Sequence, residues 1–428
     1  MEKVKVGMLG YGTIGRGVFE IMKMNRAYIT ANSGKVIEIS RVLVRDVEKN
    51  QEPLLSDPTF TTSIDDIIND GSIQIVVELM GGEEPATEYM LRALRAGKHV
   101  VTANKLAVAV GGDKLIGAAR EMDKHFFYEA SVGGGIPIIR QINESLNANR
   151  IESIAGIING TSNYILTKMS KQGRSFEEAL ALAQQKGYAE ADPTSDVGGF
   201  DAVYKLAIMT SLSFFTTVDY RDIYREGIEK VTAEDIEYAK RFGYVIKLLA
   251  IAKLHGKQLE LRVHPAMVRS DHPMANINNS YNAIYIVGNA VDDIMISGKG
   301  AGAMPTGSAV VSDIISIVKG EPIVEGVGVP KRELGVMDIG ETYMQYYIRL
   351  TVKDAAGVLA EISSVFARHQ VSICTLVQEK MEGDLAQLIF TTHFTKEGSL
   401  RQAVEAIEKL DVVEQVSSLI RIEELAKE

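Results

Sequence analysis

The chain has 428 residues, a hydrophobic fraction of 46%, a charged fraction of 24% and a formal net charge of −10, with a pI of about 5.4. This length predicts about three domains, and the acidic balance, without any dense basic run, argues against a nucleic-acid partner. The chain has one cysteine, no secretory segment and no apolar run of the ~18 residues that a membrane span needs, so we expect a soluble, cytoplasmic protein without a membrane partner.

The first predicted elements are typical of a dinucleotide-binding site. We expect Val4–Leu9 to form a buried strand and a helix to follow to about Met24. Between them lies the string GYGTIG at 10–15, and strand, G-x-G-x-x-G and helix in this order are the context that the fingerprint requires. The alternative is a plain tight turn between a strand and a helix. The place of the string in an alternating α/β pattern favours nucleotide binding.

Each position of this string has a predicted role toward the cofactor. Gly10 permits the tight turn, Gly12 lets the backbone approach the pyrophosphate, and Gly15 lets the helix pack closely on the strand. Backbone amides near Thr13 and Ile14, at the N-terminus of the helix, face the phosphates. We therefore expect all five residues to bind the cofactor.

The second predicted strand, 36–44, bears on the choice of coenzyme. It ends in Arg45-Asp46. An acidic residue at this position binds the ribose hydroxyls of NAD, whereas an arginine favours the 2′-phosphate of NADP. Arg45 lies nearest the expected position, so the sequence favours NADP and leaves NAD open. The alternative is that Arg45 is a surface residue at a strand end.

Two further strands predict the rest of the nucleotide site. The first, 73–79, ends at Met80-Gly81-Gly82, and the second, 99–102, leads into Ala103-Asn104-Lys105. Strands alternating with helices imply a parallel, doubly wound sheet. Such sheets bind ligands at the carboxyl ends of their strands, which are the places of Gly82, Thr102 and Lys105. An exposed loop lysine is the alternative for Lys105. We expect the next helix to begin at Asp113.

A second glycine-rich segment follows a predicted strand at 126–129. It spans 130–137 and contains three consecutive glycines, followed by Ile136-Pro137. A Walker loop requires Lys-Ser/Thr at that point, so this class of phosphate site is excluded. Without further information the segment is interpreted as a hinge between two domains.

The stretch 187–205, GYAEADPTSDVGGFDAVYK, carries the strongest chemical signal in the chain. It holds four carboxylates and one lysine, Lys205, which lies four positions after Asp201 and hence on the same face of a predicted helix. The rest of that face is apolar. Lysine is rarely buried unless it is paired, and burial lowers its pKa toward the range useful for proton transfer. We therefore predict a pocket in which carboxylates hold a cationic amino group and Lys205 handles a proton; the alternative is an exposed ion pair.

The middle of the chain predicts a second α+β layer with a mostly antiparallel sheet. We expect a long helix over 233–255 and strands at 259–268, 284–287 and 295–297. A broad sheet of this kind is a reasonable dimer surface. A third glycine cluster, 298–307, then leads into a helix, which is again an arrangement that suits a cofactor.

A boundary is predicted at Pro322–Asp338, and the rest of the chain reads as strand, helix, two strands, helix and strand. This βαββαβ order resembles an ACT domain, a small-molecule sensor that commonly binds amino acids. Its turn normally reads D-x-P-G-V-L, and Ala356 replaces the proline here. Cys374 lies in a predicted strand and is interpreted as a small core residue.

The stretch 187–205 resembles the signature of the homoserine dehydrogenases, and so do the fingerprint, the segment 102–105 (TANK), the glycine-rich segment and the C-terminal domain. The resemblance covers nearly the whole chain. It implies NAD(P)-dependent interconversion of L-homoserine and L-aspartate 4-semialdehyde, a step toward threonine and methionine. It also implies that the protein forms a homodimer or a homotetramer and that threonine is a possible effector.

The resemblance assigns roles to individual residues. Lys205 is the acid toward the aldehyde oxygen, Lys105 polarises the same oxygen, and Asp201 sets the state of Lys205. Gly302 touches the nicotinamide half of the coenzyme. The implied substrate-binding residues are Glu190, Asp196, Asn159, Gly160 and Thr161, with Glu190 holding the ammonium group. The implied ligands of a monovalent cation, usually sodium, are the Glu129 side chain and the carbonyls of Val132, Gly134 and Ile136.

Together these patterns predict an α/β chain with three domains. A Rossmann-type dinucleotide-binding domain spans 1–133 and takes back about 302–340, a catalytic and dimerisation domain spans 134–301, and the ACT regulatory domain spans 345–428. Two other functions stay open. One is an NAD(P) oxidoreductase acting on another small amino acid or semialdehyde, and the other is a catalytically silent amino-acid sensor.

Overall fold

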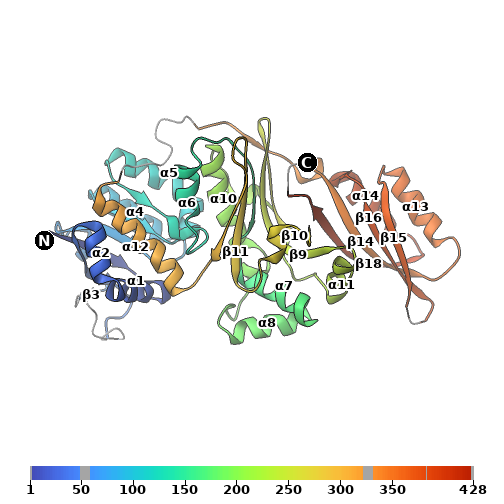
Figure 1. Ribbon diagram of the computed structural model, residues 1–428, viewed down its shortest axis with the longest axis horizontal. Coiled ribbons are helices and arrows are strands. Elements are labelled where there is room, and N and C mark those ends of the chain that lie inside the picture. Colours follow the sequence, from blue (N-terminus) through green and yellow to red (C-terminus); the bar gives the residue numbers. More distant parts are fainter. Residues whose placement is uncertain (1, 49–57, 322–330, 382, 426–428) are drawn as a thin grey trace.

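A computed structural model of the protein describes residues 2–48, 58–321, 331–381 and 383–425. The described chain forms three bodies in a row, with the N-terminal sheet at one end, a central sheet, and a C-terminal domain at the other end (Figure 1). The first nine residues of the predicted boundary at Pro322–Asp338 lie outside the described residues. Within the described residues, no helix is long and apolar enough to cross a membrane.

The N-terminal sheet confirms the predicted doubly wound arrangement, because all six of its strands run parallel. The order reverses between β1 and β4, which makes the carboxyl ends of these two strands the switch point where such sheets bind ligands. In spatial order the strands are β3 (Thr59–Thr61), β2 (Val36–Leu43), β1 (Lys3–Leu9), β4 (Ile73–Glu78), β5 (His99–Thr102) and β6 (Phe126–Phe127).

Helices cover both faces of this sheet, and one of them comes from far along the chain. The helix α12 lies along α1 (Figure 1), and the two pack so closely that a Cβ added to Gly17 would lie 2.2 Å from the Ala303 carbonyl oxygen. Only glycine at position 17 permits this approach. Through α12 the chain returns to the N-terminal body after it has formed the central sheet. The helices are α1 (Thr13–Met24), α2 (Arg26–Ser33), α3 (Asp65–Ile68), α4 (Ala86–Arg95), α5 (Lys105–Glu121) and α12 (Ala303–Lys319).

The central sheet is antiparallel along its main path, as predicted. Its strands in spatial order are β12 (Asp292–Lys299), β11 (Tyr281–Gly288), β7 (Ile151–Ile157), β9 (Tyr244–His255) and β10 (Gln258–Arg269), and the short strands β8 (Tyr224–Arg225) and β13 (Gly335–Val336) also pair with β10. The associated helical segments are η1 (Glu129–Ser131), α6 (Ile138–Arg140), η2 (Gln141–Ser145), α7 (Gly160–Gln172), α8 (Phe176–Gln185), α9 (Thr194–Val197), α10 (Phe200–Phe214), η3 (Tyr220–Asp222), α11 (Ala233–Arg241) and η4 (Pro273–Asn276).

One prediction for this body is wrong. The stretch 233–255 is not one helix, because α11 ends at Arg241 and β9 begins at Tyr244. Gly243 between them has a φ of 82°, a left-handed conformation that ends the helix. The apolar residues of β9 are buried on both faces between β7 and β10, so their run lacks the alternation typical of a half-exposed strand.

The C-terminal domain has the predicted βαββαβ order, with its helices on one face of the sheet. Its elements are η5 (Ile339–Glu341), β14 (Tyr343–Lys353), α13 (Val358–Arg368), β15 (Ile373–Lys380), β16 (Leu385–Thr392), the short β17 (Thr395–Lys396), α14 (Glu397–Ile407) and β18 (Val413–Glu423). Cys374 is exposed, so its interpretation as a core residue is wrong. It lies on β15, which is the edge strand of the sheet.

The central sheet and the sheet of the C-terminal domain are one continuous sheet. β18 runs parallel to β10, with Ala266 opposite Arg421 and Val268 opposite Glu423. Buried charges accompany this junction. Arg262 is fully buried and pairs with Glu260 and Glu423, and Arg421 donates hydrogen bonds to the carboxylates of Glu397 and Glu226 and to the Tyr224 hydroxyl. We call these residues the junction cluster.

Candidate active site

The site is organised around one buried carboxylate, Asp201, in the first turn of α10. Gly199, at a φ of 83°, precedes the helix and turns the chain so that Asp201 points inward, where it is 3% exposed. Its Oδ1 lies 2.6 Å from the Lys105 Nζ, and its Oδ2 lies 2.6 Å from the Lys205 Nζ. A single carboxylate therefore holds two lysines, one from the N-terminal body and one from its own helix. We call these three residues the Asp201 cluster.

Lys205 is the buried member of this cluster. Its Nζ also donates a hydrogen bond of 2.9 Å to the Ile158 carbonyl, at the end of β7. Burial lowers the pKa of Lys205 below its ordinary value, against the attraction of Asp201, and the nearby charge of Lys105 lowers it further. Burial works to raise the pKa of Asp201, but the two lysines outweigh it and the pKa falls. The cluster therefore keeps a charged carboxylate beside a lysine whose pKa is lowered.

Lys105 is the more accessible member, with a side chain that is 39% exposed. Asp201 raises its pKa above the ordinary value, which holds this lysine in the charged form. The helix α5 begins at Lys105 and not at Asp113 as predicted, because Asn104 caps it: the Asn104 side chain accepts a hydrogen bond from the Ala107 amide. The lysine thus stands on a rigid helix start and not on a loop.

Asn159 joins the cluster to a second carboxylate. Its Nδ2 donates to the Asp196 Oδ1 at 2.7 Å and to the Asp201 Oδ2 at 2.9 Å, while its Oδ1 caps α7. Burial raises the pKa of Asp196. Gly160 begins α7, and the Thr161 hydroxyl donates to the Tyr188 carbonyl at 2.7 Å, which ties this turn to the acidic stretch. Four of the five predicted substrate residues are thereby brought to one place.

Glu190 is the exception. Its side chain is exposed, and within the part of the chain that the structure describes its carboxylate has no ion-pair partner. Its backbone carbonyl accepts a hydrogen bond from Gln184. The Glu190 carboxylate is therefore exposed at the rim of the site, and within the described residues it is not bonded to the Asp201 cluster.

A residue that sequence reasoning missed, Glu78, joins the carboxyl ends of β4 and β5. This carboxylate is fully buried at the end of β4, where it accepts hydrogen bonds from the Met80 and Gly81 amides and, at 2.7 Å, from the Thr102 hydroxyl. Asn104 then donates to the Gly82 carbonyl at 2.6 Å. Burial raises the pKa of Glu78. The two strand ends predicted to face the cofactor are thus held together by hydrogen bonds, and an acidic residue at the end of a mostly apolar strand was the available signal.

The fingerprint has the geometry that a pyrophosphate requires. Gly10 has a φ of 99°, a Cβ on Gly15 would lie 2.8 Å from the Gly10 carbonyl oxygen, and Gly12 faces open space. No side chain caps α1, which leaves the amides of its first turn, at Thr13 and Ile14, available to a ligand. Arg45 is exposed just beyond β2. These residues fit a dinucleotide.

The glycine-rich segment folds as a tight turn that fits a carbonyl-based cation site. Gly133 and Gly134 both have positive φ, and the Val132 and Gly134 carbonyls accept no hydrogen bond from any described residue. The Ile136 carbonyl accepts one from the Ile138 amide. The Glu129 carboxylate is buried and accepts hydrogen bonds from the Ile139 and Arg140 amides. The described residues contain no cluster of three His, Cys, Asp or Glu side chains suited to a metal.

Gly302 caps α12 with a φ of 116°, directly after the strand that leads out of the central sheet.

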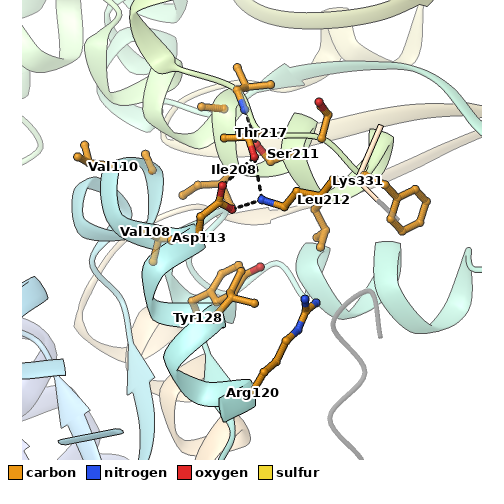
Figure 2. Close-up of a pocket in the computed structure, with 18 residues that line it drawn as sticks. Val108, Val110, Asp113, Arg120, Tyr128, Ile208, Ser211, Leu212, Thr217 and Lys331 are labelled. Carbon is orange, nitrogen blue, oxygen red and sulfur yellow. Dashed lines mark hydrogen bonds and ion pairs between the residues drawn. The ribbon is translucent and has the colours of Figure 1, made fainter. Parts of the chain in front are cut away.

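A cavity of about 230 Å³ lies further along α5 and α10 (Figure 2). Apolar side chains such as Val108 and Ile208 line it, and Asp113, Thr217 and Lys331 form a hydrogen-bonded group at its side. None of the Asp201 cluster lines this cavity, so it is separate from the site described above.

Comparisons with known proteins agree with this geometry. Family models match for the NAD-binding domain of homoserine dehydrogenase over residues 10–129, for homoserine dehydrogenase over 137–315 and for the ACT domain over 346–412. Homoserine dehydrogenase of Bacillus subtilis is 41% identical over 429 residues, covering 99% of both chains. That of Synechocystis is 42% identical over 440 residues, covering 98% of this chain and 99% of the relative.

Solved structures are similar over the whole chain or over three quarters of it. A homoserine dehydrogenase from Thiobacillus denitrificans superposes with a TM-score of 0.93 at 39% identity, covering 100% of this chain and 99% of that one. A hyperthermophilic archaeal homoserine dehydrogenase in complex with NADPH has a TM-score of 0.64 at 28% identity and covers 75% of this chain and 99% of its own. The protein described here belongs to the homoserine dehydrogenase family, with an NAD-binding domain, a catalytic domain and a C-terminal ACT domain.

Proposed function

We propose that the protein catalyses the NAD(P)-dependent interconversion of L-homoserine and L-aspartate 4-semialdehyde. The observation that carries this proposal is the Asp201 carboxylate, which holds a buried lysine and an accessible lysine 2.6 Å from its two oxygens. This pair of lysines lies where the N-terminal sheet, at its ligand-binding edge, meets the central sheet. The bound nicotinamide coenzyme supplies or accepts the hydride.

The two lysines divide the work at the substrate oxygen. In the reductive direction Lys205 donates a proton to the aldehyde oxygen, and its lowered pKa makes this transfer favourable. Lys105 stays charged and stabilises the negative charge that develops on the same oxygen. In the oxidative direction neutral Lys205 takes the proton of the homoserine hydroxyl. Asp201 holds both amino groups in place throughout.

The acidic stretch recognises the amino acid part of the substrate. Asp196 and Asn159 are held together beside the cluster, and Gly160 and Thr161 begin the adjacent helix. Glu190 binds the substrate ammonium group from its exposed position at the rim.

The experiment that tests the function follows NADPH and NADH oxidation with L-aspartate 4-semialdehyde. We expect turnover with this substrate and at most weak turnover with its six-carbon analogue. Preference for the analogue would point to another oxidoreductase in the same class. Amino-acid binding by the full chain with no turnover of either compound would point to a catalytically silent sensor.

Arg45 is proposed to select NADP. It is exposed beyond β2, where the adenosine ribose of a bound coenzyme lies in this fold. Arg45→Ala should raise the KM for NADPH by about tenfold, the worth of one charge-assisted contact, while changing the KM for NADH little. Arg95→Ala, which removes an exposed arginine from α4, is the matched control. Equal losses for both coenzymes would refute the 2′-phosphate contact.

A monovalent cation, with sodium as the first candidate, is proposed to bind at Glu129 and the carbonyls of Val132, Gly134 and Ile136. Two of these carbonyls have no hydrogen-bond donor among the described residues, and hard cations prefer oxygen ligands. Exchange of sodium for choline in the assay should lower kcat. Identical rates in both salts would remove the cation from the site.

The C-terminal domain is proposed to bind an amino-acid effector, with threonine as the first candidate, in a homodimer or a homotetramer. Titration of threonine into the intact enzyme should lower activity, and substrate should weaken threonine binding by the same factor because coupling is reciprocal. Light scattering gives the oligomeric state. An intact enzyme that ignores threonine and other amino acids of the pathway would make this domain an assembly element.

A further inference from the structure

Asn282, on β11, is a buried polar side chain whose amide forms no hydrogen bond within the described residues. It is 0% exposed, and neither its Nδ2 nor its Oδ1 has a hydrogen-bond partner there. Buried amides in native proteins are nearly always hydrogen-bonded, and an unpaired one is costly. The Asn282 amide is therefore available to partners that a small shift of its neighbours would bring within reach.

The surroundings of Asn282 identify that state. Its Nδ2 lies against the backbone of Gly300, where an added Cβ would come within 1.8 Å of it, and its Oδ1 would lie 3.6 Å from a Cβ on Gly160. Gly160 directly follows Asn159, which binds Asp201 and Asp196. Asn282 therefore lies between the start of α7 and the segment that leaves the central sheet.

That segment, Gly300–Gly302, connects the sheet to the N-terminal body. A Cβ on Gly134 would lie 2.5 Å from the Gly300 carbonyl oxygen, so the segment also rests on the glycine-rich turn. Gly302 then caps α12, which packs on α1 next to the fingerprint. A small shift of Gly300–Gly302 would change the distance between the coenzyme site and the Asp201 cluster.

We propose that Asn282 is a positioning residue that docks the Gly300–Gly302 segment against the substrate turn at Gly160 when coenzyme binds. In the bound state its amide forms hydrogen bonds with the backbone on both sides, which fixes the nicotinamide relative to Lys105 and Lys205. The role of the coenzyme in this step rests on the proposed function. Glycine is needed at position 300 because the Asn282 amide occupies the space of a side chain there.

The test uses Asn282→Leu, which removes the amide and keeps the branched shape and the number of heavy atoms, in the full-length enzyme. We expect the melting temperature of the free protein to stay equal or rise, because an unpaired buried amide is removed. NADPH should bind about tenfold more weakly, since a hydrogen bond formed only in the bound state is lost. The kcat should fall more than the KM for aspartate semialdehyde changes.

Asn149→Leu is the matched control, because the Asn149 Oδ1 is also buried without a partner and packs against Gly288 at the other end of β11. It should leave NADPH affinity unchanged. If Asn282→Leu lowers the melting temperature of the free protein and leaves NADPH affinity and kcat intact, Asn282 is a structural residue and the proposal is wrong. If the leucine variant does not fold, Asn282→Ala gives the same two binding and turnover readouts.

A second variant separates packing from positioning. Gly300→Ala should destabilise the protein, because its Cβ collides with the Asn282 amide, and the double variant with Asn282→Ala should recover stability but not kcat. Recovery of both would overturn the positioning role. The NADPH-affinity measurement needs no turnover, so failure of the proposed reaction in the wild-type enzyme is recognised separately from failure of this inference.

Discussion

The Asp201 cluster and the junction cluster are both built from buried carboxylates and cations, yet their balance differs. At the junction each buried arginine meets two or more carboxylates, such as Glu397 and Glu226 around Arg421. In the Asp201 cluster one carboxylate meets two lysines, and one of these, Lys105, reaches solvent. The junction cluster has more carboxylates than buried arginines, whereas the Asp201 cluster has a cation in excess.

The choice of cation follows the same division. Arginine stays charged under all ordinary conditions and binds carboxylates through a rigid fork, so it fixes the position of strands. Lysine shifts its pKa when it is buried and can exchange a proton. Burial lowers the pKa of Lys205, while the carboxylates raise that of Arg421 well above its ordinary value. Similar buried ion pairs therefore suit the proposed proton transfer at one place and the fixing of strands at the other.

The largest expected effect breaks the chemical side of this comparison. Lys205→Ala should lower kcat by ~10²–10⁴-fold, the usual worth of a positioned acid or base, and leave NADPH affinity nearly unchanged. Steady-state kinetics and NADPH titration measure the two quantities. The matched control is Lys247→Met, since Lys247 is also a buried lysine but is held by Asn163 and the Ile277 carbonyl without a carboxylate. A Lys205→Ala enzyme with wild-type turnover would remove the proton-transfer role.

The second largest effect is expected from a change in the junction cluster. Arg421→Met leaves the buried Glu397 with only Arg401 as a cation, and breaking a buried pair in this way should cost about 3–5 kcal/mol of unfolding free energy. The kcat of the folded enzyme should stay the same. Denaturant unfolding with parallel activity assays distinguishes the two quantities. Arg269→Met is the control, because its partner Asp271 is exposed and such pairs are worth about 0–1 kcal/mol.

The smallest effect sharpens the comparison through pH. Burial works to raise the pKa of Glu226 and Glu423, but the arginines lower both to about 2 from an ordinary 4.5. Because the folded pKa lies below the unfolded one, the stabilisation is complete above about pH 4.5 and is lost as the pH falls toward 2. In the reductive direction kcat/KM should instead fall as the pH rises, because Lys205 loses its proton at a lower pH than an ordinary lysine does. Arg421→Met should weaken the acid transition and leave the alkaline one in place.

Much of the fold was predictable because its signals are local. The fingerprint, the parallel strands and the βαββαβ order each follow from glycine positions and apolar runs within a short window. The strand β9 was not predictable in this way. Its apolar run also suits a buried helix, and only its pairing with β7 and β10 decides between the two.

The candidate site likewise contains contacts that short-range sequence patterns predict and contacts that they do not. Asp201 and Lys205 are one helical turn apart, so their contact could be predicted from spacing. The contact of Lys105 with Asp201 joins two bodies of the molecule, and Asn282 lies between the start of α7 and the Gly300–Gly302 segment, so no short-range pattern indicates either. For Glu78 the sequence offered only an acidic residue at the end of a strand. Glu190 lies in the acidic stretch, but its exposed carboxylate forms no bond with the Asp201 cluster among the described residues, so its contact with the substrate stays a prediction.

The pairing of β18 with β10 also bears on how the protein is made. Ala266 leaves the ribosome long before its partner Arg421, and at ~5–20 residues per second the interval is on the order of ten seconds. During that time this edge of β10 has unpaired backbone groups, which are a template for aggregation. β18 thus covers this edge of β10, and we expect a nascent or truncated chain that stops short of β18 to aggregate more readily than the intact chain.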